Sequence, residues 1–153
     1  NVIAEKYNLP IIVSTHPRTK KKIDEIGFQK HPLINFHKPF GFLDYVYLQM
    51  NAKAVLSDSG TITEESSILN FPALNLRETH EGQQGMEEVA VMMVGLEEER
   101  VIEGLDILKN QPKGEKRLIN RVNDYSVPNV SEKVLRIIYS YTDYINKFVW
   151  KKK

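Results

Sequence analysis

The sequence predicts an α/β domain in which a parallel β-sheet has helices on both faces. Short apolar runs rich in β-branched residues recur along the chain, and segments with the apolar spacing of amphipathic helices separate them. Strands that alternate with helices in this way form right-handed βαβ units, and such units give parallel sheets. The 153 residues, 41% of them hydrophobic, are enough to bury one core of this kind.

Each expected element follows from a local signal. Apolar, β-branched runs predict strands because such residues fit a pleated and covered surface. Pro39 and Gly41 turn the chain into a helix, and Pro72 closes the helix before it. Residues 110–125, with their Pro and Gly, predict a polar surface loop. The expected order is a helix at 2–7, a strand at 10–15, a helix at 19–26, a strand at 33–36, a helix at 43–50, a strand at 53–58, a helix at 62–70, a strand at 73–77, a helix at 86–90, a strand at 91–95, a helix at 97–108 and a helix at 134–150.

The last expected helix has more apolar surface than one face of a sheet needs. We therefore expect residues 130–153 to form a long terminal helix that crosses to a neighbouring domain. The chain also opens on Asn1, within a helix-like segment, so we expect it to be part of a longer protein. The apolar side chains of the terminal helix are Val134, Leu135, Ile138, Tyr141, Tyr144, Ile145, Phe148 and Val149.

Composition excludes several classes of function. With 21 basic and 20 acidic residues, the net charge of +1 gives no electrostatic case for nucleic acid. The absence of cysteine excludes disulfides, zinc thiolate sites and cysteine nucleophiles, and it fits a reducing compartment such as the cytoplasm. No apolar run approaches the roughly 20 residues of a membrane helix. His31, His37 and His80 share no ligand spacing, so no metal site is expected.

The turn at residues 57–65 (SDSGTITEE) is the strongest functional signal. An apolar strand runs into a small-residue turn, and a helix follows with carboxylates in its first turns. Such a turn offers amide groups and the positive end of a helix dipole to an anion, for which phosphate is the natural choice. Residues 61–64 also fit a capping box, which is purely structural, and the pattern alone leaves both readings open. Neither a P-loop nor a GxGxxG turn is present.

Two further loops leave the expected ligand edge of the sheet. His16 follows a strand and either donates to a phosphate or sugar oxygen or caps the next helix. Tyr45 and Phe40 flank the second loop, where a ring can stack on a base or pack in the core. Glu64 and Glu65 point about 100° apart on a helix and cannot form one acid/base pair. We find no catalytic residues in this chain.

Residues 57–65 and then 71–81 (FPALNLRETHE) resemble the non-hydrolysing UDP-N-acetylglucosamine 2-epimerase family. The family pattern is approximately S/T-D-S-G-G-I-Q-E-E followed by P-V-L-x-x-R-x-x-T-E-R-P, and the likeness continues upstream in Thr15-His16-Pro17 and Pro39. The tail, residues 127–133 and 149–152, is similar to the branch that makes UDP-N-acetyl-L-fucosamine for bacterial surface polysaccharide. The resemblance covers the C-terminal half of such an enzyme.

The resemblance implies one Rossmann-like half of a two-domain, GT-B-type enzyme, with the active site in the cleft. It implies that Ser59, Gly60 and Thr61 take the phosphates of UDP, Glu65 the ribose hydroxyls, Tyr45 the uracil, and that His16 faces the sugar nucleotide. The implied reaction eliminates UDP and re-adds it with C2 inverted, without a cofactor. Its acid/base carboxylates belong to the first domain, so residues 1–153 alone should be inactive. The family also favours a homodimer.

Two residues depart from the family pattern. Thr61 stands where the family has a second Gly, which a negative φ would permit. Gly82 stands where the family has an Arg expected to bind the pyrophosphate, and loss of that contact should cost about 1.5–3 kcal/mol, or roughly ten- to a hundred-fold in affinity. Two alternatives therefore remain: the nucleotide-sugar-binding half of a GT-B glycosyltransferase, and a non-catalytic binding module.

Overall fold

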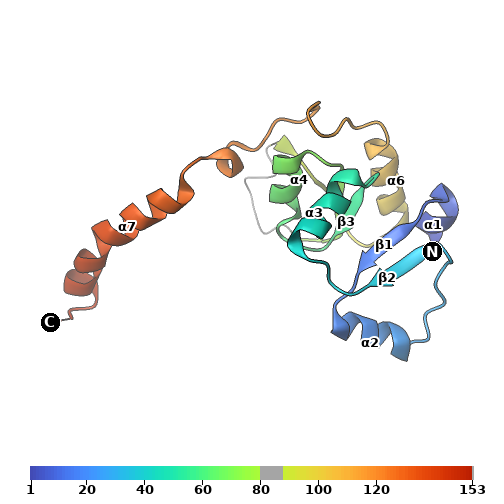
Figure 1. Ribbon diagram of the computed structural model, residues 1–153, viewed down its shortest axis with the longest axis horizontal. Coiled ribbons are helices and arrows are strands. Elements are labelled where there is room, and N and C mark those ends of the chain that lie inside the picture. The colour runs from blue at the N-terminus through green and yellow to red at the C-terminus, as the bar shows by residue number, and fades with distance from the viewer. Residues whose placement is uncertain (80–87, 153) are drawn as a thin grey trace.

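The computed structural model describes residues 1–79 and 88–152. Within them, β1 (Ile11–Ser14) pairs with β2 (Ile34–His37), and β3 (Val55–Ser57), β4 (Ala73–Asn75) and β5 (Met92–Met93) form a second ladder in the order β3-β4-β5. All of these pairs are parallel, which confirms the predicted α/β class (Figure 1). The sheet differs from the expectation in one respect: it is in two pieces, because β1 and β3 are not hydrogen-bonded neighbours.

The helices lie close to their predicted positions. α2 begins two residues before its predicted start, because Pro17 occupies its first turn and His16 caps it. The terminal helix begins at Val130, the first residue of the predicted segment 130–153 and four residues before the helix predicted at 134–150, and Ile145–Val149 is π-helical. Residues 86 and 87 of the helix predicted at 86–90 lie outside the described residues, as do His80 and Gly82. The described helices are α1 (Val2–Tyr7), α2 (Pro17–Glu25), α3 (Phe42–Asn51), α4 (Ile62–Leu69), α6 (Glu98–Leu108), the 3₁₀ turn η1 (Asn123–Ser126), α7 (Val130–Tyr144) and η2 (Ile145–Val149).

The core is built around β4, whose three residues are all buried. Ala73 packs in one cluster with Ile62 of α4, and Leu74 in another with Val101 of α6. Successive side chains of a strand point to opposite faces of the sheet, so α4 and α6 cover opposite faces of the second ladder. This arrangement confirms the prediction of helices on both faces.

Polar contacts attach α1 to α6. Lys6 Nζ and the Tyr7 hydroxyl both donate to Asp106, over 2.8 and 2.9 Å, and these hydrogen bonds lower the pKa of the Asp106 carboxyl below its ordinary value. On the inner side of α1, Ile3 packs against the Leu74 cluster. The β1–β2 ladder is therefore joined to the second ladder through α1.

The segment predicted as a surface loop, residues 110–125, packs along α4. Asn70 ends α4 in the left-handed conformation, and its amide donates to the carbonyls of Gly114 and Lys116 over 2.8 and 2.7 Å. The Val122 amide donates to the Ser67 hydroxyl over 2.9 Å, and Val122 is buried. These contacts fix the position of residues 110–125 against α4, which their composition did not predict.

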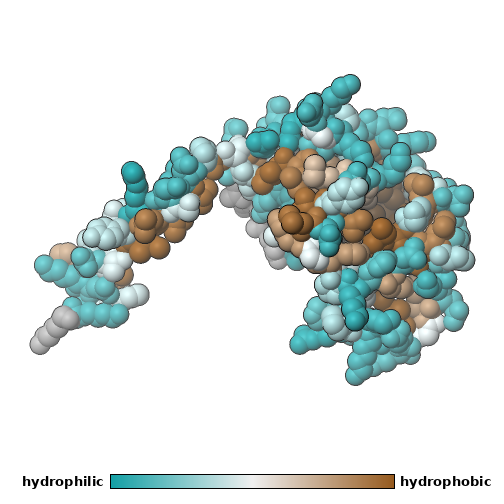
Figure 2. All heavy atoms as spheres, viewed as in Figure 1, coloured by the Kyte–Doolittle hydropathy of each residue, from teal (hydrophilic) through white to brown (hydrophobic). Residues whose placement is uncertain are grey.

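α7 and η2 project away from the rest of the molecule (Figure 1), and neither contains a buried residue. Their apolar side chains form a stripe on one side of the projecting helix (Figure 2). Ile138, for example, is 58% exposed. None of the helices in residues 1–79 and 88–152 is both long and apolar enough to cross a membrane.

Candidate functional site

The candidate site lies at the carboxyl ends of β3 and β4. Ser57, the last residue of β3, is in register with Asn75, the last residue of β4, so the loops that follow both strands leave the same edge of the sheet. Residues 58–61 connect β3 to α4 there. Ligands of doubly wound sheets bind outside this edge.

Hydroxyl groups hold the loop between β3 and α4. The Ser59 amide donates to Ser57 Oγ over 3.1 Å, and the Thr61 amide donates to Ser59 Oγ over 3.3 Å. In the described part of the chain, no group accepts a hydrogen bond from the Gly60 amide. Of the open amides expected here, only that of Gly60 has no acceptor among the described residues, because the amides of Ser59 and Thr61 bond to serine hydroxyls. The Ser59 hydroxyl is itself 3.0 Å from Thr61 Oγ1.

Thr61 does not form the capping box that residues 61–64 fit. Its φ and ψ of −77° and −7° are helical, and its side chain makes no cap bond. Thr61 Oγ1 donates instead to Glu65 Oε1 over 2.6 Å. Because the φ of Thr61 is negative, a residue with a Cβ fits where the family pattern has glycine.

Glu65 links this loop to α3. Besides the Thr61 hydroxyl, its carboxylate accepts a 2.5 Å hydrogen bond from Gln49 Nε2. An ionised carboxylate has about four acceptor positions, so roughly two remain for a ligand. Gln49 is 2% exposed and its Oε1 has no partner in the part of the chain that the structure describes.

Tyr45 lies beside Glu65. Burial, together with the charges of Glu65 and Asp58, raises the pKa of the Tyr45 phenol above its ordinary value. Gln49 follows Tyr45 by four residues and so shares its face of α3. Sequence analysis missed Gln49, although this spacing was the signal that could have identified it. Phe40 lies away from the group, with its ring against His37 at a centroid distance of 5.4 Å.

Glu64 occupies a different environment from Glu65. It lies near Tyr125 of η1, where burial and the charges of Glu64 and Asp124 raise the pKa of the Tyr125 phenol. Glu64 Oε2 is buried without a partner among the described residues. The two sequential carboxylates therefore lie in different surroundings on α4, as the roughly 100° between successive helical residues predicts.

His16 caps α2. Its Nδ1 accepts a hydrogen bond from the Arg18 amide over 3.2 Å, which is the structural alternative considered for this residue. A neutral imidazole that accepts at Nδ1 carries its proton on Nε2. The exposed His16 ring can therefore cap the helix and still donate to a ligand through Nε2. The structure does not bring it into the group formed by Tyr45, Gln49, Thr61 and Glu65.

Arg77 is a second residue that sequence analysis passed over. It follows β4 by two residues, and its Nε donates to the carbonyl oxygen of Asp58. A guanidinium is thereby held against the backbone of the loop that precedes α4. Its position just after the carboxyl end of a strand was the available signal.

No group of three or more His, Asp or Glu side chains in the described ranges has the arrangement of a metal site. Gly82, where the family pattern has an arginine, lies outside those ranges. The described site is therefore a loop with one open amide, a carboxylate with spare acceptor positions and a tyrosine beside it.

Comparison with known proteins decides the family. The family described as UDP-N-acetylglucosamine 2-epimerase matches residues 1–139 of this chain. The chain belongs to that family. A UDP-N-acetylglucosamine 2-epimerase of Methanocaldococcus jannaschii is 32% identical over 140 residues, which cover 89% of this chain and 37% of the relative. A Neisseria meningitidis protein of the same name is 30% identical over 139 residues.

Solved structures of the family have the same fold. The UDP-N-acetylglucosamine 2-epimerase of Rickettsia bellii superposes with a TM-score of 0.87 and 46% identity over 99% of this chain and 42% of that one. The M. jannaschii epimerase in complex with UDP-GlcNAc and UDP gives a TM-score of 0.78 at 31% identity, over 91% of this chain and 38% of that one. Residues 1–153 thus span less than half the length of the epimerases they match.

Proposed function

We propose that residues 1–153 form the UDP-binding, C-terminal domain of an epimerase that inverts C2 of a UDP-2-acetamido sugar. The observation that carries the proposal is the convergence of Tyr45, Thr61 and Glu65 at the carboxyl ends of β3 and β4. Family membership and the UDP-bound M. jannaschii relative support it. The proposal names a class of sugar because one relative, 26% identical, is named a UDP-2,3-diacetamido-2,3-dideoxy-D-glucuronate 2-epimerase.

In this proposal each described residue has a physical role. The Gly60 amide and the start of α4 bind the phosphates. The Ser59 and Thr61 hydroxyls bond to each other and to Glu65 in this structure, so they exchange these partners to reach the phosphates. Glu65 accepts hydrogen bonds from the ribose hydroxyls, and Tyr45 packs against the uracil. His16 donates from Nε2 to the sugar nucleotide. Arg77 holds the loop in place and adds positive charge beside it.

The chemistry needs more than this domain. Elimination removes the C2 proton and breaks the C1–O bond to UDP; re-addition reforms the C1–O bond and delivers a proton to the opposite face of C2. These proton transfers require an acid and a base, and Glu64 and Glu65 face different surroundings here. We assign the acid/base carboxylates to an N-terminal domain, so residues 1–153 alone should bind UDP but have no epimerase activity. We also place the full-length enzyme in the cytoplasm as a homodimer that supplies surface polysaccharide synthesis.

The projecting helix supports a two-domain organisation. α7 and η2 carry an apolar stripe and no buried residue (Figure 2). A helix of this kind is stable when its apolar face is covered. We therefore assign residues 130–153 to the contact with the N-terminal domain.

The decisive test gives the full-length protein UDP-GlcNAc without any acceptor and follows C2 by NMR. The proposal expects inversion to the manno-configured sugar and exchange of the C2 hydrogen with solvent. A protein that leaves the sugar unchanged until an acceptor is added would be a glycosyltransferase. One that binds UDP and never changes the sugar would be a binding module.

A further inference from the structure

Hydrogen bonds connect Ser59 and Thr61 to Glu65 in one direction. The two hydroxyl oxygens lie 3.0 Å apart, and Thr61 Oγ1 lies 2.6 Å from Glu65 Oε1. A hydroxyl has one proton to donate and an ionised carboxylate has none, so Thr61 donates to Glu65 and Ser59 donates to Thr61. Both protons therefore point toward Glu65, and neither is available to a ligand. We call these three residues the hydroxyl relay.

The second hydrogen bond to Glu65 is fixed, unlike the one from the hydroxyl relay. Gln49 Nε2 donates to Glu65 Oε2 over 2.5 Å, and Gln49 is 2% exposed, so the side chains around it hold its amide in place. Ser59 and Thr61 are exposed, and a hydroxyl proton changes partner by rotating about the C–O bond. Thr61 is therefore the donor to Glu65 that a ligand can replace.

A phosphate bound at this loop reverses the hydroxyl relay. An anion accepts hydrogen bonds, so Ser59 and Thr61 bind it only after they turn their protons away from Glu65. Glu65 Oε1 then loses the donor that it has in this structure. A carboxylate that loses a hydrogen bond is destabilised unless another donor takes the same position. A ribose hydroxyl is a donor of this kind.

We propose that Thr61 couples recognition of the phosphates to recognition of the ribose, an inference that rests on the proposed function. In this structure the Thr61 hydroxyl occupies an acceptor position of Glu65. When the phosphates accept the Thr61 hydrogen bond instead, that position becomes free for a ribose hydroxyl. Each part of the ligand then strengthens binding of the other, because coupling between two binding events is reciprocal. Thr61 is a positioning residue, since it acts on the ribose through Glu65.

The coupling needs a hydroxyl at position 61. The family pattern has glycine where this chain has Thr61, and glycine has no side-chain donor to exchange. The φ of −77° and ψ of −7° lie in the helical region, which serine and valine also adopt. Thr61→Val therefore removes the hydroxyl and keeps the shape of the side chain, whereas Thr61→Ser keeps the hydroxyl.

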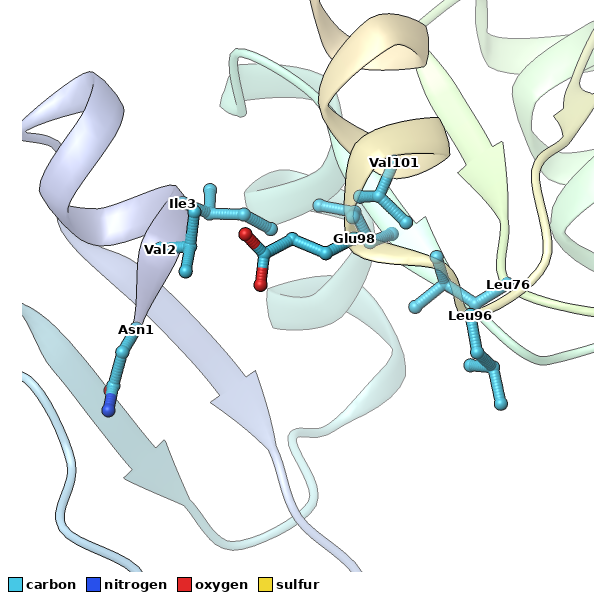
Figure 3. A pocket seen from close by; sticks show the side chains of 8 residues that line it. Asn1, Val2, Ile3, Leu76, Leu96, Glu98 and Val101 are labelled. Carbon is cyan, nitrogen blue, oxygen red and sulfur yellow. The ribbon is translucent and has the colours of Figure 1, made fainter.

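An apolar cavity beside β3 is a different place where a base can bind. It has a volume of about 240 Å³, and its lining includes Ile3 of α1, Leu56 of β3 and Val101 of α6 (Figure 3). None of the described residues that line it belongs to the hydroxyl relay. The affinity of a nucleoside bound there would not depend on Thr61, so variants of Thr61 distinguish the two locations.

Affinities of four ligands for the full-length protein, measured by calorimetry and ligand-observed NMR, test the proposal. The ligands are UDP, uridine and the 2′,3′-dideoxy form of each. The dissociation constant of the dideoxy form divided by that of the parent ligand measures the contribution of the ribose hydroxyls. In the natural protein this ratio should be larger for UDP than for uridine by about fivefold or more.

The variants separate coupling through Thr61 from a general advantage of the larger ligand. In Thr61→Val no hydroxyl occupies Glu65, so the ratio for uridine should rise until it equals the ratio for UDP within about twofold. Thr61→Gly, which introduces the residue of the family pattern, should behave like Thr61→Val. Thr61→Ser should restore the difference of about fivefold or more. A misfolded site would lower both ratios and would not raise the ratio for uridine.

Three results would overturn the proposal. Thr61→Val and Thr61→Gly could leave the ratio for uridine as it is in the natural protein, which includes the case of a nucleoside in the apolar cavity. Thr61→Ser could behave like Thr61→Val. In both cases UDP still binds, so the proposed function stands and only the coupling fails. A natural protein that does not bind UDP would contradict the proposed function and the coupling together.

Discussion

Glu65 accepts hydrogen bonds from Gln49 of α3 and from Thr61 of the adjacent loop, and its charge acts on Tyr45. The motif SDSGTITEE was sufficient to single out Glu65, because its place one turn into a helix after a strand has a chemical meaning. Gln49 had no such motif, since a glutamine in a helix is ordinary. Its spacing of four residues from Tyr45 places it on the same face of α3, and the packing of α3 against α4 then brings it to Glu65.

A charge substitution at Glu65 should change the pKa of Tyr45. Burial is the largest cause of the raised pKa and the Glu65 carboxylate the next, so Glu65→Gln should lower the pKa of Tyr45 without returning it to its ordinary value. An NMR titration of the tyrosine Cζ resonances measures this. Glu64→Gln is the matched control: it should lower the pKa of Tyr125 and leave Tyr45 unchanged. An equal response of Tyr45 to both variants would contradict the assigned geometry.

At the scale of elements, sequence patterns predicted most helices and strands but not how their ends are held. Asn70 illustrates the difference: the pattern predicted that α4 ends there, but not that the Asn70 side chain bonds to residues more than forty positions away. Polar contacts of this kind depend on the course of residues 110–125. The composition of that segment predicts a loop but does not predict which part of the protein the loop packs against.

Asn70 combines a left-handed backbone with two side-chain hydrogen bonds, and two variants separate them. Asn70→Gly keeps the φ of 56° accessible and loses both bonds, which should cost about 1–3 kcal/mol of unfolding free energy. Asn70→Ala should cost roughly 1–2 kcal/mol more, because a Cβ disfavours the left-handed region. Urea denaturation of the full-length protein measures both. Equal losses would show that the backbone conformation does not matter there.

Gly104 determines how closely α6 approaches β4. A Cβ at this position would lie 3.0 Å from both terminal methyl groups of Leu74 and 3.1 Å from Val94 Cγ1. Gly104→Ala should therefore destabilise the protein by about 1–3 kcal/mol, although alanine is the better helix former. Glu103→Ala, on the exposed face of α6, is the control and should be neutral within about 0.5 kcal/mol. A stabilised Gly104→Ala variant would mean that α6 has room to move outward.

At the scale of the whole molecule, the α/β class and the parallel strands were predictable, because alternating strands and helices allow few other topologies. The split between β1 and β3 was not predictable. Both strands have apolar sequences typical of covered strands, and such a sequence does not show whether a neighbouring strand is hydrogen-bonded to it. The excess of apolar residues in the terminal helix predicted that it crosses to a neighbouring domain. α7 contains no buried residue, and the crossing itself stays a prediction.

The stripe on α7 should be buried in the full-length protein. Ile138 is 58% exposed in residues 1–153, so Ile138→Ser should matter only if another domain covers it. We expect it to lower the unfolding free energy of the full-length protein by about 1.5–3 kcal/mol. Arg136→Ser, elsewhere on the helix, should change it little. Indistinguishable stabilities of the two variants would count against the assigned domain contact.

The central claim is that Glu65 holds the ribose of UDP at the carboxyl ends of β3 and β4, and calorimetric titration of the full-length protein tests it most directly. Glu65→Gln should weaken UDP binding by about 1.5–3 kcal/mol, or roughly ten- to a hundred-fold. Glu64→Gln should bind UDP within about twofold of the natural protein. The difference in affinity between Glu65→Gln and the natural protein should also vanish with 2′,3′-dideoxy-UDP, which lacks the ribose hydroxyls. Binding of UDP by Glu65→Gln with unchanged affinity would contradict the account.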